Sequence, residues 1–284
     1  MTVRHYDWLA HHANFTPDRT VWTDLHSGRS FTYTEAEDRC NRLAWHLQNN
    51  CDIAKGERIG VLAMNSTDMM EIQSACAKIG AIFLPLNWRL TVPELDFIIK
   101  DADPKVLIHD LAFADEAAAL KESTDVAYFI ETTGGGGDTP YEAAISAAQT
   151  NPVLADLTHD DVWTIMYTSG TTGLPKGAMN TYGMAFYNAV NLGIPFRITP
   201  DSVALTILPL FHTGGLNCYT SVCLHTGGTS LIMRAFEPGE VLRLIGDPDQ
   251  AVTHFFGVPA NYLFMSQHPE FATTDFSRLV CAGI

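Results

Sequence analysis

The densest group of chemically capable residues lies in one stretch of eleven, Tyr167–Gly177, which reads YTSGTTGLPKG. It contains three glycines, four serine or threonine hydroxyls and a single lysine, Lys176. Glycines let the backbone adopt positive φ and approach a ligand closely, and successive backbone N–H groups in such a turn can form an anion-binding concavity. The hydroxyls add donors, and Lys176 adds a mobile positive charge. The stretch is therefore predicted to bind a polyphosphate.

Two other phosphate-binding patterns do not fit this stretch. Lys176 is followed by Gly177, whereas the Gly-x4-Gly-Lys-Ser/Thr loop requires a hydroxyl residue there. The order of the glycines also differs from Gly-x-Gly-x-x-Gly. A Gly/Ser/Thr cluster after a strand is often an ordinary loop, but the addition of a lysine in this order favours ligand binding.

A second stretch, Leu208–Asn217 (LPLFHTGGLN), places an aromatic residue, a histidine and two glycines close together. Phe211 offers a ring surface, and His212 offers an imidazole. Gly214 and Gly215 are expected to leave space for an apolar substrate where side chains would block it.

Tyr167–Gly177 closely resembles the signature of the AMP-forming acyl-CoA synthetases and their relatives, the adenylate-forming superfamily. Leu208–Asn217 resembles a second landmark of that family, where an aromatic and histidine pair lies at the acyl pocket. Phe256–Ala260 (FGVPA) resembles a third landmark, at the pocket wall. The resemblance covers essentially the whole chain and ends before the family's adenine-binding segment, magnesium-binding acid and C-terminal domain. It implies an N-terminal fragment of a fatty-acid–CoA ligase-like protein.

The resemblance also implies roles for individual residues. ATP would be bound by Thr168, Ser169, Gly170, Thr171, Thr172, Gly173 and Lys176. Thr168 and Lys176 would be the catalytic residues in this piece, and Thr168 is also a candidate ligand of Mg²⁺. The carboxylic acid would lie against Phe211, His212, Gly214, Gly215, Val258 and Pro259.

The reaction that the resemblance implies has two steps. A carboxylate attacks the α-phosphorus of ATP to give an acyl-adenylate and pyrophosphate, and the thiol of CoA then displaces AMP. ATP, Mg²⁺ and CoA are therefore expected as cofactor or co-substrates, and a fatty or other aliphatic acid is favoured by the paired glycines. The fragment alone is expected to form no thioester, because parts that the family needs lie beyond its end.

Three alternatives stay open. An aryl-CoA ligase of the coumarate or benzoate kind would use the same chemistry on a ring-bearing acid. A non-catalytic module that binds nucleotide or acyl group would need only part of the machinery. Oxidative light emission shares the fold and the adenylation step, but no residue here indicates it specifically.

Composition narrows the class of protein. The chain has 284 residues, of which 46% are hydrophobic, so a sizeable core is expected. A net charge of −15 argues against nucleic acid or an anionic membrane surface as the main partner. No apolar run approaches the ~20 residues that a membrane helix needs. The six cysteines form no Cys-x-x-Cys pair and indicate free thiols in a reducing compartment, the cytoplasm.

Buried strands are expected at 162–166, immediately before the first chemical stretch, and at 203–210, which runs into the second, because these runs are apolar. Further strands are expected at 58–64, 81–86, 105–109, 127–131, 229–233, 252–258 and 279–284. Helices are expected between them, at about 36–47, 66–79, 141–149, 182–192 and 259–267. Alternating strands and helices favour parallel β-α-β units.

The helix starts carry capping signals. Thr32 with Glu35, or Thr34 with Glu37, could form a capping box at the first of these helices. Asn65–Ser66 is expected to cap the second.

By analogy with the family, the predicted fold is α/β, with two interlocked α/β subdomains of largely parallel sheets flanked by helices. About 55–195 would form one subdomain, and about 1–54 plus 196–284 would form the second, truncated at its C-terminal side. The chain stops within an apolar run, which indicates truncation. An open strand edge there would favour a homodimer.

Overall fold

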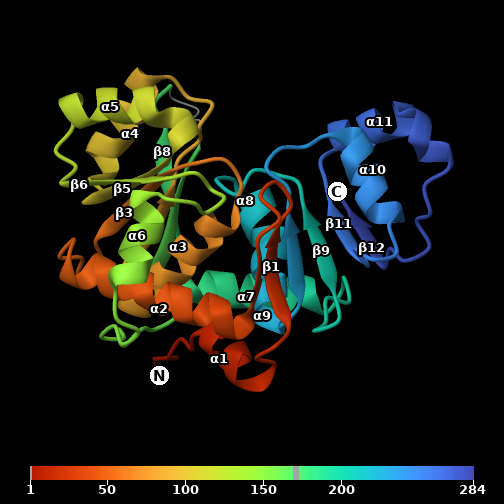
Figure 1. Ribbon diagram of the computed structural model, residues 1–284, viewed down its shortest axis with the longest axis horizontal. Coiled ribbons are helices and arrows are strands. Elements are labelled where there is room, and N and C mark those ends of the chain that lie inside the picture. The colour runs from red at the N-terminus through yellow and green to blue at the C-terminus, as the bar shows by residue number, and fades with distance from the viewer. Residues whose placement is uncertain (1, 169–172) are drawn as a thin grey trace.

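The computed structural model describes residues 2–168 and 173–284. Its strands form two six-stranded sheets, which Figure 1 shows on the left and right of the molecule. The first sheet has the spatial order β6 (Tyr128–Thr132), β5 (Val106–Asp110), β3 (Arg58–Leu62), β4 (Ile82–Pro85), β7 (Val162–Thr168) and β8 (Lys176–Thr181). Neighbouring strands are parallel except β7 and β8, which are antiparallel.

Helices cover both faces of the first sheet because alternate strand residues point to opposite sides. On one face, Ile59 and Val61 of β3 join a core with α2 (Tyr33–Asn49), α3 (Thr67–Ile79) and α6 (Pro140–Ala147). On the other face, Leu62 joins a core with α4 (Val92–Ala102) and α5 (Ala114–Ser123). This double cover explains why the strands are apolar throughout.

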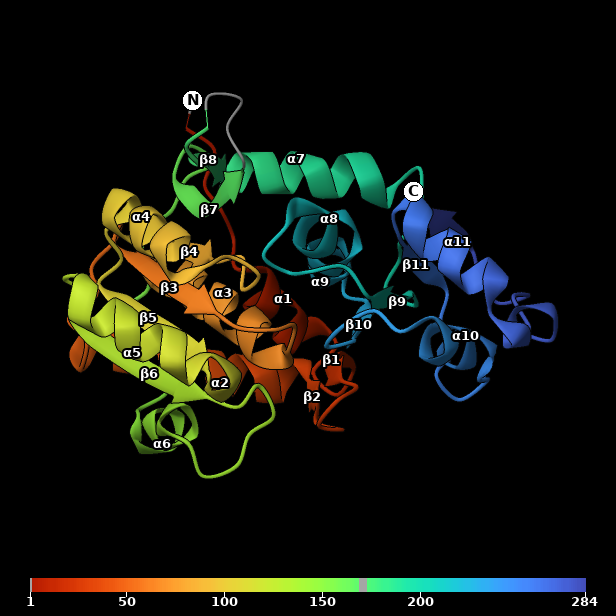
Figure 2. The same cartoon turned by 90° about the horizontal axis from the view of Figure 1, so that it is seen from above.

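The second sheet has the spatial order β12 (Cys281–Gly283), β11 (His254–Phe256), β9 (Val203–Thr206), β10 (Thr229–Ile232), β1 (Thr20–Asp24) and β2 (Ser30–Thr32). Only its β1–β2 pair is antiparallel among the described strands. One face packs on α10 (Pro238–Gly246) and α11 (Pro259–Gln267), and the other joins the core of α1 (Trp8–Phe15), α7 (Tyr182–Gly193) and α9 (Ser221–Thr226). In Figure 2, α7 runs from β7 and β8 towards the second sheet.

The predicted α/β fold, with two largely parallel sheets flanked by helices, is confirmed. The second sheet takes strands from both ends of the chain, and the first takes the strands between 58 and 181. Where the subdomain boundaries fall along the chain stays a prediction. None of the helices in the described part of the chain is long and apolar enough to cross a bilayer.

One of the predicted helix caps forms as expected and the others do not. Thr32 and Glu35 form the predicted capping box of α2, with both reciprocal hydrogen bonds. The alternative with Glu37 does not form, since Glu37 instead pairs with the Lys78 ammonium at 2.6 Å. Ser66 is the N-cap residue of α3 but makes no side-chain cap bond.

A buried ionic cluster joins α2, α3 and α6. Arg39 of α2 donates to Glu71 of α3 at 2.6 Å and to Glu142 of α6 at 2.8 Å. Arg29, from the turn between β1 and β2, also donates to Glu142, at 2.9 Å. The Glu71 side chain is fully buried, so its charge depends on Arg39 for compensation.

Aromatic rings and histidines pack the N-terminal segment against the body of the protein. The ring of His5 lies 4.3 Å from that of Tyr182 in α7, and Trp8 lies 4.9 Å from His225 in α9. Burial lowers the pKa of His5 and of His225 from 6.5 to about 4. Both imidazoles are therefore neutral in the folded protein at pH 7.

Acid is expected to destabilise the fold through these histidines. Their folded pKa lies below the unfolded value, so the unfolded chain binds more protons between the two values. The stabilising contribution is fully present above pH 6.5 and is lost as the pH falls towards about 4. Urea unfolding at pH 7.5 and pH 5 measures this loss, and His225→Phe should reduce it. An unchanged pH dependence in that variant would rule out His225 as a contributor.

The six cysteines are free thiols, as expected. Cys40, Cys51, Cys76 and Cys223 are buried, and Cys218 and Cys281 are partly buried.

Candidate functional site

The two ends of the glycine- and hydroxyl-rich stretch lie side by side at the edge of the first sheet. β7 ends at Thr168 and β8 begins at Lys176, and these two residues are partners in the antiparallel pair. Lys176 is thus the first residue of a strand and not part of a loop, and its side chain is exposed. Gly173 is exposed and adopts φ +96°, which favours glycine. The predicted residues Ser169, Gly170, Thr171 and Thr172 lie outside the described residues.

Tyr167 anchors the end of β7 to a helix. Its hydroxyl donates a hydrogen bond to the carboxylate of Asp101 in α4. Burial and this carboxylate raise the pKa of Tyr167, so the hydroxyl keeps its proton at neutral pH. The ring lies over Gly177 on β8, where an added Cβ would meet it at 3.1 Å. Tyr167 thus links the end of β7 to α4 and packs against β8.

A cavity of about 550 Å³ opens beside these strand ends. Its wall contains Thr168 and Gly173 from the predicted phosphate-binding stretch and Phe211 and His212 from the second stretch. The remaining lining residues come mainly from the end of β4 and from α4, namely Pro85, Leu86, Asn87, Leu90, Pro93, Glu94, Phe97, Ile98, Tyr167, Leu174 and Pro175. The fold thus brings together two stretches that are more than thirty residues apart in sequence.

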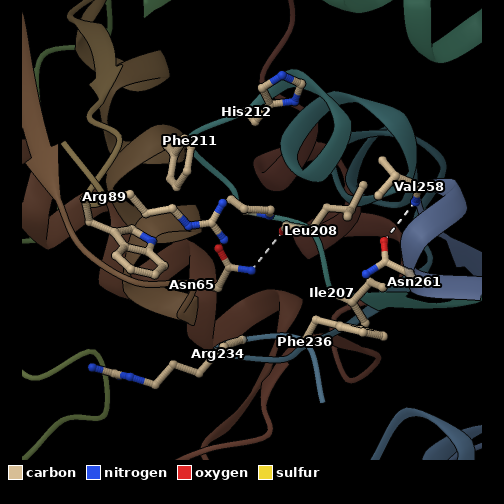
Figure 3. Close-up of a pocket in the computed structure, with 13 residues that line it drawn as sticks. Asn65, Arg89, Ile207, Leu208, Phe211, His212, Arg234, Phe236, Val258 and Asn261 are labelled. Carbon is tan, nitrogen blue, oxygen red and sulfur yellow. Dashed lines mark hydrogen bonds between the residues drawn. The ribbon is translucent and has the colours of Figure 1, made fainter. Parts of the chain in front are cut away.

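A second cavity, of about 480 Å³, lies at the carboxyl ends of β9, β10 and β11 (Figure 3). Phe211 and His212 line it as well, so they stand between the two cavities. The other lining residues are Asn65, Trp88, Arg89, Ile207, Leu208, Pro209, Arg234, Ala235, Phe236, Val258 and Asn261. Crevices at the carboxyl ends of parallel strands are common ligand sites in α/β proteins.

His212 is the N-cap residue of the short helix α8 (Thr213–Gly215), and a backbone hydrogen bond orients its ring. Its Nδ1 accepts a hydrogen bond from the backbone N–H of Gly214 at 3.2 Å. In the neutral imidazole the proton must then lie on Nε2. His212 can therefore donate one hydrogen bond from Nε2 to an oxygen of a bound ligand.

Only some of the other residues predicted to bind the acid line a cavity. Val258 lines the cavity of Figure 3, whereas Pro259 is exposed at the start of α11 and lines neither cavity described above. A Cβ on Gly214 would meet Leu208 at 3.2 Å. A Cβ on Gly215 would lie only 2.2 Å from the carbonyl oxygen of Pro209. Backbone packing already requires Gly215, which removes one of the two glycines from the argument for substrate space.

Sequence reasoning missed two cavity residues on the segment after β4. Arg89 lies over the ring of Trp88 at 4.9 Å and over that of Phe211 at 5.8 Å. Their adjacency in the sequence was the only available signal, and a neighbouring Trp-Arg pair has many ordinary explanations. Arg234, which also lines this cavity, pairs with the carboxylate of Asp110 and so connects the two sheets.

Among the described residues no group of three or more Cys, His, Asp and Glu side chains is arranged to bind a metal ion. Thr168 lies at the end of β7 with an exposed side chain. Its hydroxyl could act as a single oxygen ligand, which suits Mg²⁺ when substrate phosphates supply further ligands.

Comparison with known proteins gives consistent matches along the chain. A family model described as AMP-binding enzyme matches residues 9–283. Feruloyl-CoA synthase of an Amycolatopsis species is 36% identical over 279 residues, covering 97% of this chain and 53% of the relative. Long-chain-fatty-acid–CoA ligase FadD13 of Mycobacterium tuberculosis is 31% identical over 274 residues, covering 96% and 53%. ATP-bound MatB from Rhodopseudomonas palustris superimposes with a TM-score of 0.86 at 27% identity, covering 97% and 54%. The chain therefore spans about half the length of these proteins.

Proposed function

Because the chain belongs to the family of AMP-binding enzymes, we propose that the protein containing it is an ATP-dependent acid–thiol ligase. It converts a carboxylic acid, ATP and CoA into acyl-CoA, AMP and pyrophosphate through an acyl-adenylate. The observation that carries this proposal is the cavity shared by Thr168, Gly173, Phe211 and His212. With the phosphates of ATP near Thr168 and Gly173, an acid near Phe211 and His212 would bring its carboxylate close to the α-phosphorus.

The phosphate chain of ATP would lie at the ends of β7 and β8. Donors from the segment Thr168–Gly173 would bind its oxygens, and Lys176 would neutralise charge on the leaving pyrophosphate. Mg²⁺ would arrive with the phosphates, and Thr168 is its candidate ligand on this chain. The likeness to a structure of ATP-bound MatB supports ATP as the nucleotide.

The 284-residue chain alone should form no thioester. A hydrogen bond to a charged group contributes about 1.5–3 kcal/mol, whereas enzymes commonly lower barriers by about 8–23 kcal/mol. The donors at one strand edge are too few for that. Incubation of the isolated chain with ATP, Mg²⁺, CoA and an acid tests this expectation, and acid-dependent pyrophosphate release would contradict it.

For the acid, we propose a ring-bearing carboxylate, the alternative to the aliphatic acid that the paired glycines favoured. The rings of Trp88 and Phe211 line the cavity of Figure 3 and offer flat surfaces for stacking. Gly215 is required by backbone packing, which weakens the aliphatic case. The relative that is 36% identical is a feruloyl-CoA synthase. An aliphatic acid stays the second candidate, supported by the likeness to a long-chain-fatty-acid–CoA ligase.

A panel of acids tests the substrate class on the full-length protein. Pyrophosphate release is measured with ferulate, 4-coumarate, benzoate, octanoate and palmitate at equal concentrations. We expect kcat/KM to be highest for a hydroxycinnamate. A preference for octanoate or palmitate would support the second candidate, and saturable ATP binding without release for any acid would support a non-catalytic binding module.

A cytoplasmic location and a homodimer stay predictions from the sequence. The same holds for partners limited to small molecules, without nucleic acid.

A further inference from the structure

The side chain of Asn65 connects the two sheets at the cavity of Figure 3. Asn65 follows β3 of the first sheet and is 4% exposed. Its Nδ2 donates to the carbonyl oxygen of Leu208 at 2.9 Å and to that of Met233 at 3.1 Å. Its Oδ1 accepts from the backbone N–H of Leu210 at 2.8 Å. Both donor hydrogens and one acceptor position are thus used on backbone groups of the second sheet's loops, and Figure 3 shows the bond to Leu208.

One of these partners, Leu210, lies in the turn that carries Phe211 and His212, and another, Leu208, directly precedes it. The backbone N–H of His212 donates to the carbonyl of Pro209 at 3.0 Å, which closes a four-residue turn. A β-turn leaves the inner N–H groups without a partner inside the turn. Asn65 supplies that partner to Leu210 and also binds the carbonyl just before the turn. The turn is therefore held from outside, by a residue of the other sheet.

The third partner extends the connection to a neighbouring strand. Met233 directly follows β10, whereas Leu208 and Leu210 follow β9. One amide thus fixes the carboxyl ends of β9 and β10 relative to that of β3. The sequence suggested only a helix-capping role, but the Asn65 side chain makes its three hydrogen bonds across the junction between the sheets.

We propose that Asn65 is a positioning residue: its amide holds the Pro209–His212 turn so that Phe211 and His212 stand between the two cavities. The side chain of Asn65 hydrogen-bonds to backbone groups, and His212 is the residue that would contact the reacting atoms. The proposal depends on the proposed function at one point only, because it assumes that His212 faces the acid. The placement of the turn itself can be tested without any enzymatic activity.

The first test uses the 284-residue chain and the imidazole of His212. In Asn65→Asp, one carboxylate oxygen can still accept from the N–H of Leu210. The other oxygen replaces the NH₂ group that donates to two carbonyls, so two of the three contacts are lost. Asn65→Ser shortens the side chain and removes all three contacts without adding charge, and it serves if the first variant does not fold. ¹⁵N NMR of the imidazoles, with His212→Gln used to assign the signal, reports the tautomer.

For the neutral imidazole, we expect the wild type to favour the tautomer protonated at Nε2, and the Asn65 variants to show a larger share of the other tautomer. Tyr33→Phe is the matched control, because it removes another buried hydrogen bond, to Gly228 at 2.8 Å, from a residue that lines neither cavity. It should keep the wild-type tautomer. A folded Asn65 variant with an unchanged His212 signal would overturn the proposal.

The second test is a double-mutant cycle in the full-length protein. Asn65→Asp is expected to lower kcat/KM for the acid about 10²-fold, the loss that a misplacement of about 1 Å can cause, and to leave KM for ATP within about twofold. In a His212→Ala background the same change should cost less than about threefold, because the group being positioned is gone.

Losses that multiply in the double variant would assign Asn65 a general structural role and contradict the proposal. If His212→Ala alone leaves kcat/KM unchanged, the proposed role of His212 at the acid fails. The tautomer measurement then still decides whether Asn65 holds the turn.

Discussion

Replacing Lys176 with alanine in the full-length protein is expected to slow acid-dependent pyrophosphate release about 10²–10³-fold at saturating ATP, the loss typical of removing one preorganised group that stabilises transition-state charge. Lys176 begins β8 directly beside Thr168, and its side chain is exposed. Negative charge grows on the leaving pyrophosphate as its bond to the α-phosphorus breaks, so the ammonium should matter more for kcat than for substrate binding.

Two variants control for general effects of charge. Lys176→Arg keeps the charge but changes its geometry, and should recover part of the rate. Lys100→Ala removes an exposed lysine paired with Asp96 on α4 and should leave the rate near wild type. Wild-type pyrophosphate release by Lys176→Ala would show that the ammonium takes no part in adenylation.

Arg39→Ala is expected to lower the free energy of unfolding by about 3–5 kcal/mol, the usual result of breaking a buried ion pair by removing one partner. The variant leaves the carboxylate of Glu71 fully buried without its cation, beside the carboxylate of Glu142. It also removes the guanidinium from the face of Phe31, 5.1 Å away. Urea denaturation of the 284-residue chain at pH 7.5 measures the change.

Arg243→Ala is the matched control, because Arg243 is half exposed and pairs with Glu240 within one helix turn. Such pairs contribute about 0–1 kcal/mol. Equal losses in the two variants would mean that burial of the Arg39 cluster has no energetic consequence.

Much of the scaffold was predictable because its strands are buried on both faces. Apolar runs such as Arg58–Leu62 carry that signal directly, and reciprocal polar pairs such as Thr32 and Glu35 mark helix starts. β8 was missed because Lys176–Thr181 is an exposed edge strand with no apolar alternation. The sequence-based strand at 203–210 ends early, at Thr206, because the turn held by Asn65 follows it.

The candidate site was only partly predictable, because the fold brings together residues that lie far apart in the sequence. Spacing in the sequence gives no reason for Thr168 and His212 to line one cavity, and their meeting depends on where β7 and β9 end. Gly215 is required because a Cβ there would clash with the carbonyl of Pro209, whereas the sequence suggested that it leaves space for a substrate. Asn65 shows the same difficulty, because a polar residue before a helix resembles a cap until its partners are known.

The central claim is that the Tyr167–Gly177 stretch binds the phosphate tail of ATP. Hydrogen–deuterium exchange of the 284-residue chain, with and without ATP and Mg²⁺, tests this claim directly. We predict slower exchange in the peptide spanning Tyr167–Gly177 at saturating ATP, and loss of most of that protection in Lys176→Ala. ATP binding that protects other segments and leaves this peptide unchanged would contradict the account.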